Sequence, residues 1–231
     1  MDIRTLPEEE REIYNRIHAQ YKLSFDKLKV RDTTIRLLKV ADIEEFLDGK
    51  DPFADVSEFP FWVKLWEAAM ILSYALASLP DPKGQTLLEI GAGLGAPGIT
   101  AAACGFDVTL TDYEDIIMDF QKVSVAASGL HNVRCAHLDW LNPPEMEPFD
   151  VITAAEVLFR EEFFEPLLAV FKKYLKPGGT IYLAHDARRK CLPLFMERAK
   201  KEYDIAGSKQ SMRKDGQDIT IIINRLRLKK A

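Results

Sequence analysis

LEIGAGLGAPG, at residues 88–98, sets the architecture that we expect of this chain. It joins an apolar run, QTLLEI at 85–90, to a segment with helical spacing at 96–104. Gly91 permits a tight turn after the strand, and Gly93 lets a ligand approach the backbone closely. A strand, a glycine-rich turn and a helix in this order are typical of open α/β sheets, in which ligands bind beyond the carboxyl ends of the strands.

Outward from this loop, short apolar runs alternate with helical segments. The expected strands are 85–90, 107–111, 132–136, 149–155, 180–185, 203–210 and 218–228, and the expected helices between them are 96–104, 114–128, 161–175 and 189–202. Such alternation predicts a Rossmann-like α/β fold, a seven-stranded and mostly parallel sheet with helices on both faces. We expect Pro177-Gly178-Gly179 to turn the chain, and the last two runs to form an antiparallel hairpin at the sheet edge.

The N-terminal region, residues 1–60, predicts a small cap on a ligand-binding domain at 61–231. The cap's expected elements are a helix at 6–19, a hairpin at 20–40 across Arg31-Asp32 and a short acidic helix at 41–49. Within the main domain, residues 64–79 have strong helical spacing and few polar side chains, so we expect a largely buried helix there.

Composition limits the partners and the compartment. The 231 residues are 47% apolar and 29% charged, which is ordinary for a globular protein. A net charge of -5 argues against a broad nucleic-acid surface, and no apolar run approaches the roughly 18 residues of a membrane span. Three cysteines without CxxC spacing predict neither disulfides nor a metal site. We therefore expect a cytoplasmic monomer that binds neither nucleic acid nor membrane.

Two acidic residues flank the glycine loop. Asp112 ends the next strand, 21 residues after Gly91, where a carboxylate can accept hydrogen bonds from both ribose hydroxyls of a cofactor. A nicotinamide dinucleotide would use nearly the same parts. Glu89 disfavours it, because a carboxylate gains little beside a pyrophosphate, whereas it suits the sulfonium and amino-acid moiety of S-adenosyl-L-methionine.

Five segments carry a family resemblance. They are LWEAAMIL at 65–72, LEIGAGLGAPG at 88–98, TDY at 111–113, LDW at 138–140 and AAEVLF at 154–159. In order and spacing they resemble the class I, seven-stranded S-adenosylmethionine-dependent methyltransferases, and more narrowly the METTL21-like protein lysine methyltransferase family. The last segment is similar to this family's (Asp/Glu)-x-x-(Tyr/Phe) motif. The resemblance runs from about Phe61 to the C-terminus.

The resemblance implies a cofactor, S-adenosyl-L-methionine, which leaves as S-adenosyl-L-homocysteine, and a set of site residues. The implied cofactor-binding residues are Trp66, Glu89, Gly91, Ala92, Gly93, Asp112, Tyr113, Asp139, Trp140 and Ala155. Glu156 would hold the ammonium of an acceptor lysine, and Phe159 would form a wall around its alkyl stem. Phe159 has no hydroxyl, so a role that depends on a tyrosine hydroxyl does not carry over. The implied partner is a protein substrate that carries a lysine.

Alternatives remain open at this point. The same fold also serves small-molecule methyltransferases, and a non-catalytic cofactor-binding interaction module would retain most of these residues. Trp66 and Trp140 would serve equally as core residues, and Glu156 as an acid at a helix N-terminus. His185 and Asp186, which end the strand at 180–185, are expected to form a structural pair beside the site. Asn142-Pro143-Pro144-Glu145 resembles an adenine-methyltransferase motif but precedes the strand that such a motif should follow, so we interpret it as a loop.

Overall fold

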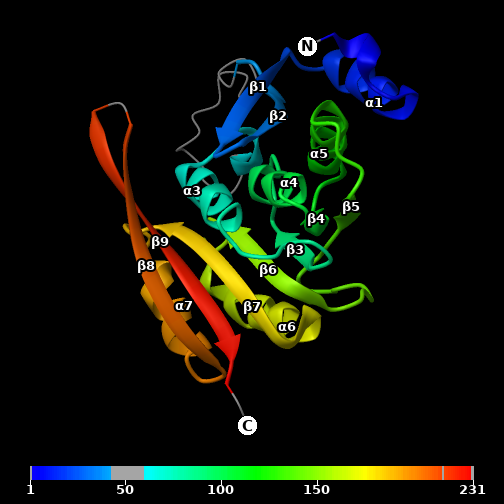
Figure 1. Ribbon diagram of the computed structural model, residues 1–231. Helices are drawn as coiled ribbons and strands as arrows, with labels where there is room; N and C mark the ends of the chain where they lie inside the picture. Colours follow the sequence, from blue (N-terminus) through cyan, green and yellow to red (C-terminus); the bar gives the residue numbers. More distant parts are fainter. Residues whose placement is uncertain (1, 43–59, 215, 230–231) are drawn as a thin grey trace.

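A computed structural model describes residues 2–42, 60–214 and 216–229, and its centre is one twisted sheet (Figure 1). The seven strands lie in the order β5-β4-β3-β6-β7-β9-β8. Their bounds are β3 Thr86–Ile90, β4 Asp107–Asp112, β5 Val133–His137, β6 Phe149–Ala155, β7 Leu175–Asp186, β8 Tyr203–Lys214 and β9 Gln217–Leu228. Strands β3 to β7 pair in parallel, while β9 pairs antiparallel with both β7 and β8. The predicted sheet and its closing hairpin are confirmed.

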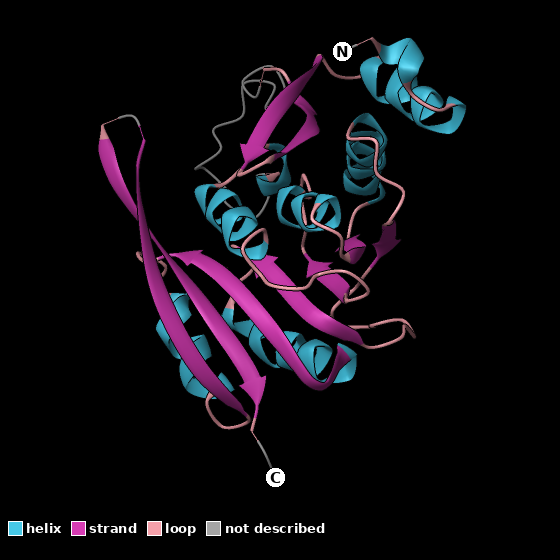
Figure 2. Ribbon diagram, in the orientation of Figure 1, coloured by secondary structure: helices cyan, strands magenta, loops and turns pink. Residues whose placement is uncertain are grey.

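Helices cover both faces of the sheet (Figure 2). The α-helices are α1 Glu8–His18, α3 Glu67–Leu76, α4 Ala96–Ala103, α5 Asp115–Ala127, α6 Phe164–Tyr174 and α7 Cys191–Ala199, and the short 3-10 turns are η1 Ile3–Thr5, η2 Phe61–Val63 and η3 Glu161–Phe163. Helices α3, α4 and α5 lie on one face, and α6 and α7 lie on the other. None of the helices in the described residues combines the length and the apolar composition that a membrane span requires.

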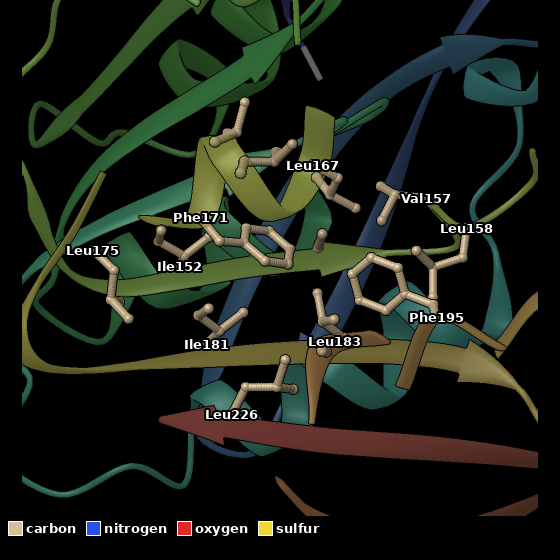
Figure 3. Packing of buried hydrophobic residues seen from close by; sticks show 14 of the residues in the cluster. Ile152, Val157, Leu158, Leu167, Phe171, Leu175, Ile181, Leu183, Phe195 and Leu226 are labelled. Atoms are coloured by element: carbon tan, nitrogen blue, oxygen red, sulfur yellow. The ribbon is translucent and has the colours of Figure 1, made fainter. Parts of the chain in front are cut away.

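The core under α6 and α7 is aromatic. Phe171 and Phe195 are fully buried and meet edge-on, with ring centroids 6.4 Å apart. They pack over Ile152 of β6 and over Ile181 and Leu183 of β7, as Figure 3 shows. Because β-branched and leucine side chains from neighbouring strands fill the space beneath these rings, the carboxyl ends of β6 and β7 are held firmly in place. The site described below lies at those ends.

The N-terminal hairpin is bonded directly to the sheet domain. Strands β1 (Leu23–Val30) and β2 (Thr33–Val40) pair antiparallel around a two-residue turn, as predicted. The backbone N–H of Leu38 donates to Ser124 Oγ of α5 at 2.8 Å. The division into a cap at 1–60 and a domain at 61–231 stays a prediction, and the acidic helix expected at 41–49 falls almost wholly outside the described residues.

Two expectations about local structure were wrong. Helix α3 begins at Glu67, because Trp66 is extended (ψ 149°), and it buries only one face, since Tyr74 is 45% exposed. Pro177-Gly178-Gly179 redirects the chain as predicted, with Gly178 at φ 81°, but it does so within β7, which begins at Leu175 and not at the expected residue 180. Pairing with β6 moves from Leu175 to Thr180 while β6 advances only two residues, so the segment bulges within β7. A bulge absorbs the extra residues without ending the strand.

Candidate active site

The glycine loop follows β3. On one side of β3 the sheet continues through β4 and β5, and on the other side through β6 and β7, so the loop lies at the topological switch point of the sheet. Gly91, Gly93 and Gly95 have φ angles of 60°, 52° and 75°, a region that side chains disfavour. The Ala92 N–H donates to Thr111 O at 3.0 Å and ties the loop to β4. Open α/β sheets bind their ligands in the crevice at this point.

Asp112 is held directly against this loop. Its two carboxylate oxygens accept the backbone N–H groups of Gly93 and Tyr113, each at 2.8 Å. Burial raises the pKa of Asp112, and the two backbone hydrogen bonds oppose that rise. The predicted ribose acid and the predicted glycine loop therefore lie together at the carboxyl ends of β3 and β4.

Gln121, which the sequence did not single out, supports the same loop from α5. Its side chain is fully buried, and its Nε2 donates to Gly93 O at 2.9 Å. No sequence signal marked it, because a single glutamine on a helix has no motif and its contact depends on how α5 packs.

Glu89 lies beneath the loop rather than at its surface. The side chain is 1% exposed, and Oε2 accepts the N–H of Gly98 in α4 at 2.7 Å. Burial raises the pKa of Glu89 to about 8, because desolvation favours the protonated carboxyl, and the Gly98 hydrogen bond opposes this rise. Its predicted role as a charge near the cofactor stays a prediction.

An aromatic cluster borders the loop on the β6 side. The ring of Trp140 lies 6.3 Å from Phe159 and 5.8 Å from Phe163, measured between centroids. A Cβ atom added at Gly91 would come within 3.6 Å of Trp140, so this indole lies against the loop backbone. Phe159, expected as a wall for the acceptor, packs toward Trp140 and is 51% exposed. Phe163 is an additional member that the motifs did not predict.

Two further cofactor candidates, Asp139 and Tyr113, stand at the edges of this region. Asp139 accepts the Leu141 N–H at 2.9 Å and the Asn142 side-chain amide at 3.1 Å, and these bonds lower its pKa, the amide contributing most. Tyr113 is 64% exposed, with its ring 5.4 Å from that of His137. Contacts of these residues with a cofactor stay predictions.

Glu156, the predicted acceptor acid, directly follows Ala155 at the end of β6. Its φ angle is 58°, a conformation that costs a non-glycine residue of the order of 1–3 kcal/mol and is typical of functional sites. Oε1 accepts the Asp186 N–H at 2.7 Å, and Oε2 accepts Nε–H of Arg189 at 2.6 Å. The sequence did not predict Arg189, because a turn 33 residues away brings it to this carboxylate.

A cleft of about 590 Å³ opens beside Glu156, and Trp66 and Arg189 also line it. The loop glycines are not among its lining residues. The indole Nε1–H of Trp66 donates to Phe61 O at 2.7 Å, and the Lys64 ammonium lies 4.6 Å from the Trp66 ring. The structure thus places Trp66 in the same cleft as the predicted acceptor acid, and its contact with a cofactor stays a prediction.

His185 and Asp186 do not form the expected pair. His185 is fully buried, its Nε2 accepts the Leu158 N–H at 3.3 Å, and burial lowers its pKa to about 3. Asp186 pairs with Arg188 at 2.6 Å. The prediction was wrong because successive residues of a strand point to opposite faces.

The donor set fits a nucleoside cofactor. A glycine cradle, Gly91 to Gly95, follows β3, a carboxylate ends β4, and the Trp140 indole lies against the cradle at Gly91. The cofactor contact expected of Ala155 stays a prediction. The arrangement can hold a nucleoside beside an acid that faces a separate cleft.

A family model for lysine methyltransferases matches residues 60–202, more than half of the chain. The chain belongs to the lysine methyltransferase family. The resemblance to METTL21-like members is thereby confirmed. Protein N-lysine methyltransferase METTL21A of Xenopus tropicalis is 32% identical over 62% of this chain and 68% of its own length.

Two other relatives of the family are longer than this chain. Protein-lysine N-methyltransferase rrg1 of Schizosaccharomyces pombe is 32% identical over 54% of this chain and 46% of its own length. Histidine protein methyltransferase 1 homolog of Dictyostelium discoideum is 33% identical over 62% of this chain and 48% of its own length. The matched region thus spans about half the length of each of these two relatives.

Solved structures support the same fold. The precorrin-6y C5,15-methyltransferase of Geobacter metallireducens aligns with a TM-score of 0.59 and 14% identity, over 72% of this chain and 91% of that chain. The ribosomal protein L11 methylase of Lactobacillus delbrueckii aligns with a TM-score of 0.56 and 20% identity, over 72% and 81%. The fold is therefore the Rossmann-like methyltransferase fold.

Proposed function

We propose that this protein transfers a methyl group from S-adenosyl-L-methionine to a lysine side chain of a protein substrate. The observation that carries the proposal is the position of Glu156, directly after Ala155 at the end of β6, where it lines the cleft. Family membership and the lysine-specific names of METTL21A and rrg1 support lysine as the acceptor.

S-adenosyl-L-methionine, when bound, supplies a methyl group on a positively charged sulfur. Gly91, Gly93 and Asp112 would hold its nucleoside, with Trp140 beside the base. Glu156 would bind the arriving ammonium and orient it, and exclusion of water from the cleft would favour the neutral amine that can act as a nucleophile. The protein's part is therefore placement and desolvation. The acceptor nitrogen would lose one proton to solvent when it becomes the neutral amine, and it would carry a positive charge again once it is methylated.

Two variants separate cofactor binding from methyl transfer. We expect Glu156→Ala to keep its dissociation constant for S-adenosyl-L-methionine within about twofold while methyl transfer falls by about a hundredfold or more, because orientation of the acceptor is lost. We expect Asp112→Ala to weaken cofactor binding by about tenfold or more, because a charged hydrogen-bond partner is removed. Calorimetric titration measures the first quantity, and radiolabelled methyl transfer to lysate proteins, followed by mass spectrometry of the modified residue, measures the second.

Equal loss of binding and transfer in Glu156→Ala would contradict its assignment as the acceptor acid. An unchanged dissociation constant in Asp112→Ala would remove that residue from the ribose role. Label found on histidine rather than lysine would replace the proposed acceptor.

We also propose a monomer in the cytoplasm that acts on protein and not on nucleic acid. The three unpaired cysteines, Cys104, Cys135 and Cys191, support a reducing compartment. The net charge of -5 supports the absence of a nucleic-acid partner.

A further inference from the structure

The cleft beside Glu156 lies between the start of α3, the turn after β7 and the first residues of β9, which pair with β8. Strand β9 begins at Gln217, but its pairing with β7 reaches only Ile221, so its first residues extend past the end of β7 and form one wall. The ribbon in Figure 1 shows β9 extending past the end of β7, beside α3. An acceptor side chain that enters here meets Glu156 from the side away from the glycine loop.

Glu156 is a fixed partner at the base of this cleft. Its backbone N–H donates to Ala184 O at 3.0 Å, and the Asp186 N–H holds its Oε1. Its side chain is only 10% exposed. The carboxylate therefore cannot follow a ligand outward, and Oε2 is the oxygen whose partner can be exchanged.

Arg189 is the exchangeable partner. Its side chain is 35% exposed and comes from the turn that joins β7 to α7, outside any helix or strand. Its one contact with Glu156 is through Nε, on one oxygen. A guanidinium that already reaches solvent can leave the carboxylate at little cost in hydration, provided that another cation takes its place.

The charges that line the cleft balance while Arg189 is in place. Three carboxylates, Glu67, Glu156 and Asp186, face three cations, Lys64, Arg188 and Arg189. When Arg189 leaves, three carboxylates face two cations, and the cleft gains a net attraction for a positive charge.

We propose that Arg189 is a placeholder for the methyl acceptor: it pairs with Glu156 Oε2 until the acceptor takes its place. Arg189 thereby determines which chemical class of acceptor can bind. The inference rests on the proposed function. An ammonium with N–H donors can replace Nε–H of Arg189 at Glu156 Oε2, whereas a neutral hydroxyl or imidazole would leave a nearly buried carboxylate without a cationic partner. Arg189 is a specificity-determining residue in this account, and it takes no part in the transfer itself.

The ion pair can be observed directly by NMR of protein labelled with ¹⁵N-arginine. The Arg189 Nε–H signal, assigned by its loss in Arg189→Lys, is expected to be protected from exchange, and Glu156→Gln should abolish that protection. Addition of n-butylammonium chloride, a mimic of the lysine side chain, should shift this signal and end its protection. Tetramethylammonium chloride at equal ionic strength lacks N–H donors and should not, and n-butanol lacks the charge and should not.

Affinity gives a second readout with a matched control. We expect Arg189→Gln to bind n-butylammonium about tenfold more tightly than the natural protein, because a competing charged hydrogen bond is gone. The shift of the Trp66 indole N–H at the cleft reports the titration. Arg198→Gln removes an arginine of nearly the same side-chain exposure, 36% against 35%, which pairs with Glu161 outside the cleft, and it should titrate like the natural protein.

The outcomes separate this inference from the proposed function. Release of Arg189 by n-butylammonium alone supports the placeholder, even if no methyl transfer is found. Equal release by tetramethylammonium or n-butanol, no release by n-butylammonium, or unchanged affinity in Arg189→Gln would overturn it, even if lysine methylation is established.

Discussion

Glu89 makes the glycine loop sensitive to pH through one buried carboxyl. In the unfolded chain its pKa is near 4.5, and burial in the folded protein raises the pKa to about 8. The folded state therefore binds this proton more tightly. The stability that the group contributes is fully present below pH 4.5 and is lost as the pH rises toward about 8.

Replacing Glu89 with Gln should remove this dependence. The amide keeps an oxygen for the Gly98 N–H but does not titrate. Between about pH 5 and pH 8, the free energy of unfolding of the natural protein should fall relative to that of Glu89→Gln, by up to about 1.4 kcal/mol per pH unit. Urea unfolding of both proteins across this range measures the difference. Parallel stability curves would show that the carboxyl is already ionised at neutral pH.

The residues of the candidate site differ in whether the sequence alone could predict them. The places of Asp112 and Glu156 at strand ends could be predicted, Asp112 from the apolar strand that it ends and Glu156 from the resemblance of AAEVLF to a family motif. Gln121 and Arg189 could not, because their partners are reached through space: one depends on the packing of α5, and the other on a turn after β7. The partner of Glu156 is thus less predictable than Glu156 itself.

At the scale of elements, α5 completes the hydrogen bonding of β2. Ser124 Oγ accepts the N–H of Leu38, which is fully buried, and it donates to Phe120 O. One hydroxyl therefore joins the edge of the N-terminal hairpin to a helix of the sheet domain. Without the Ser124 hydroxyl, the buried N–H of Leu38 would lack a hydrogen-bond partner, which would destabilise the folded protein.

We expect Ser124→Ala to lower the free energy of unfolding by about 1–3 kcal/mol for this reason. Ser78→Ala is the matched control, because Ser78 Oγ also donates to the carbonyl four residues earlier, Tyr74 O, but lies exposed in the turn after α3. The control should change stability by less than about 0.5 kcal/mol. Chemical unfolding followed by circular dichroism compares the two. Equal effects would mean that the Leu38 bond contributes nothing specific.

Elements whose apolar pattern is unbroken were the easiest to predict. The hairpin around Arg31-Asp32 and the strands β3 and β6 follow from alternation and apolar runs alone. The start of α3 and the bulge at Pro177-Gly178-Gly179 did not follow. The extended backbone at Trp66 has no signal in the sequence. The pairing of β7 before and after the bulge depends on β6, and proline and glycine signal a break without saying whether a strand ends or bulges.

For the whole molecule, the hydrophobic core joins the N-terminal hairpin to the sheet. Ile35 and Leu37 of β2 belong to the same buried cluster as Leu87 of β3 and Ile99 of α4. Leu38 and Val40 of β2 lie in a second buried cluster with Ile117 and Phe120 of α5, so the buried side chains of the hairpin pack against helices of the sheet domain. The proposed cap and domain should then share one stability.

Hydrogen exchange at increasing urea concentrations tests whether the cap and the domain unfold together. Amides of β2 and of β6 should converge on one free energy of opening and one dependence on urea, because the hairpin can separate only by exposing the core that α4 and β3 also need. The exposed β8–β9 tip should open at lower free energy and serves as an internal control. If β2 opened well below β6, the hairpin would be a separately unfolding unit, and it could then uncover the α5 side of the glycine loop while the sheet stays folded.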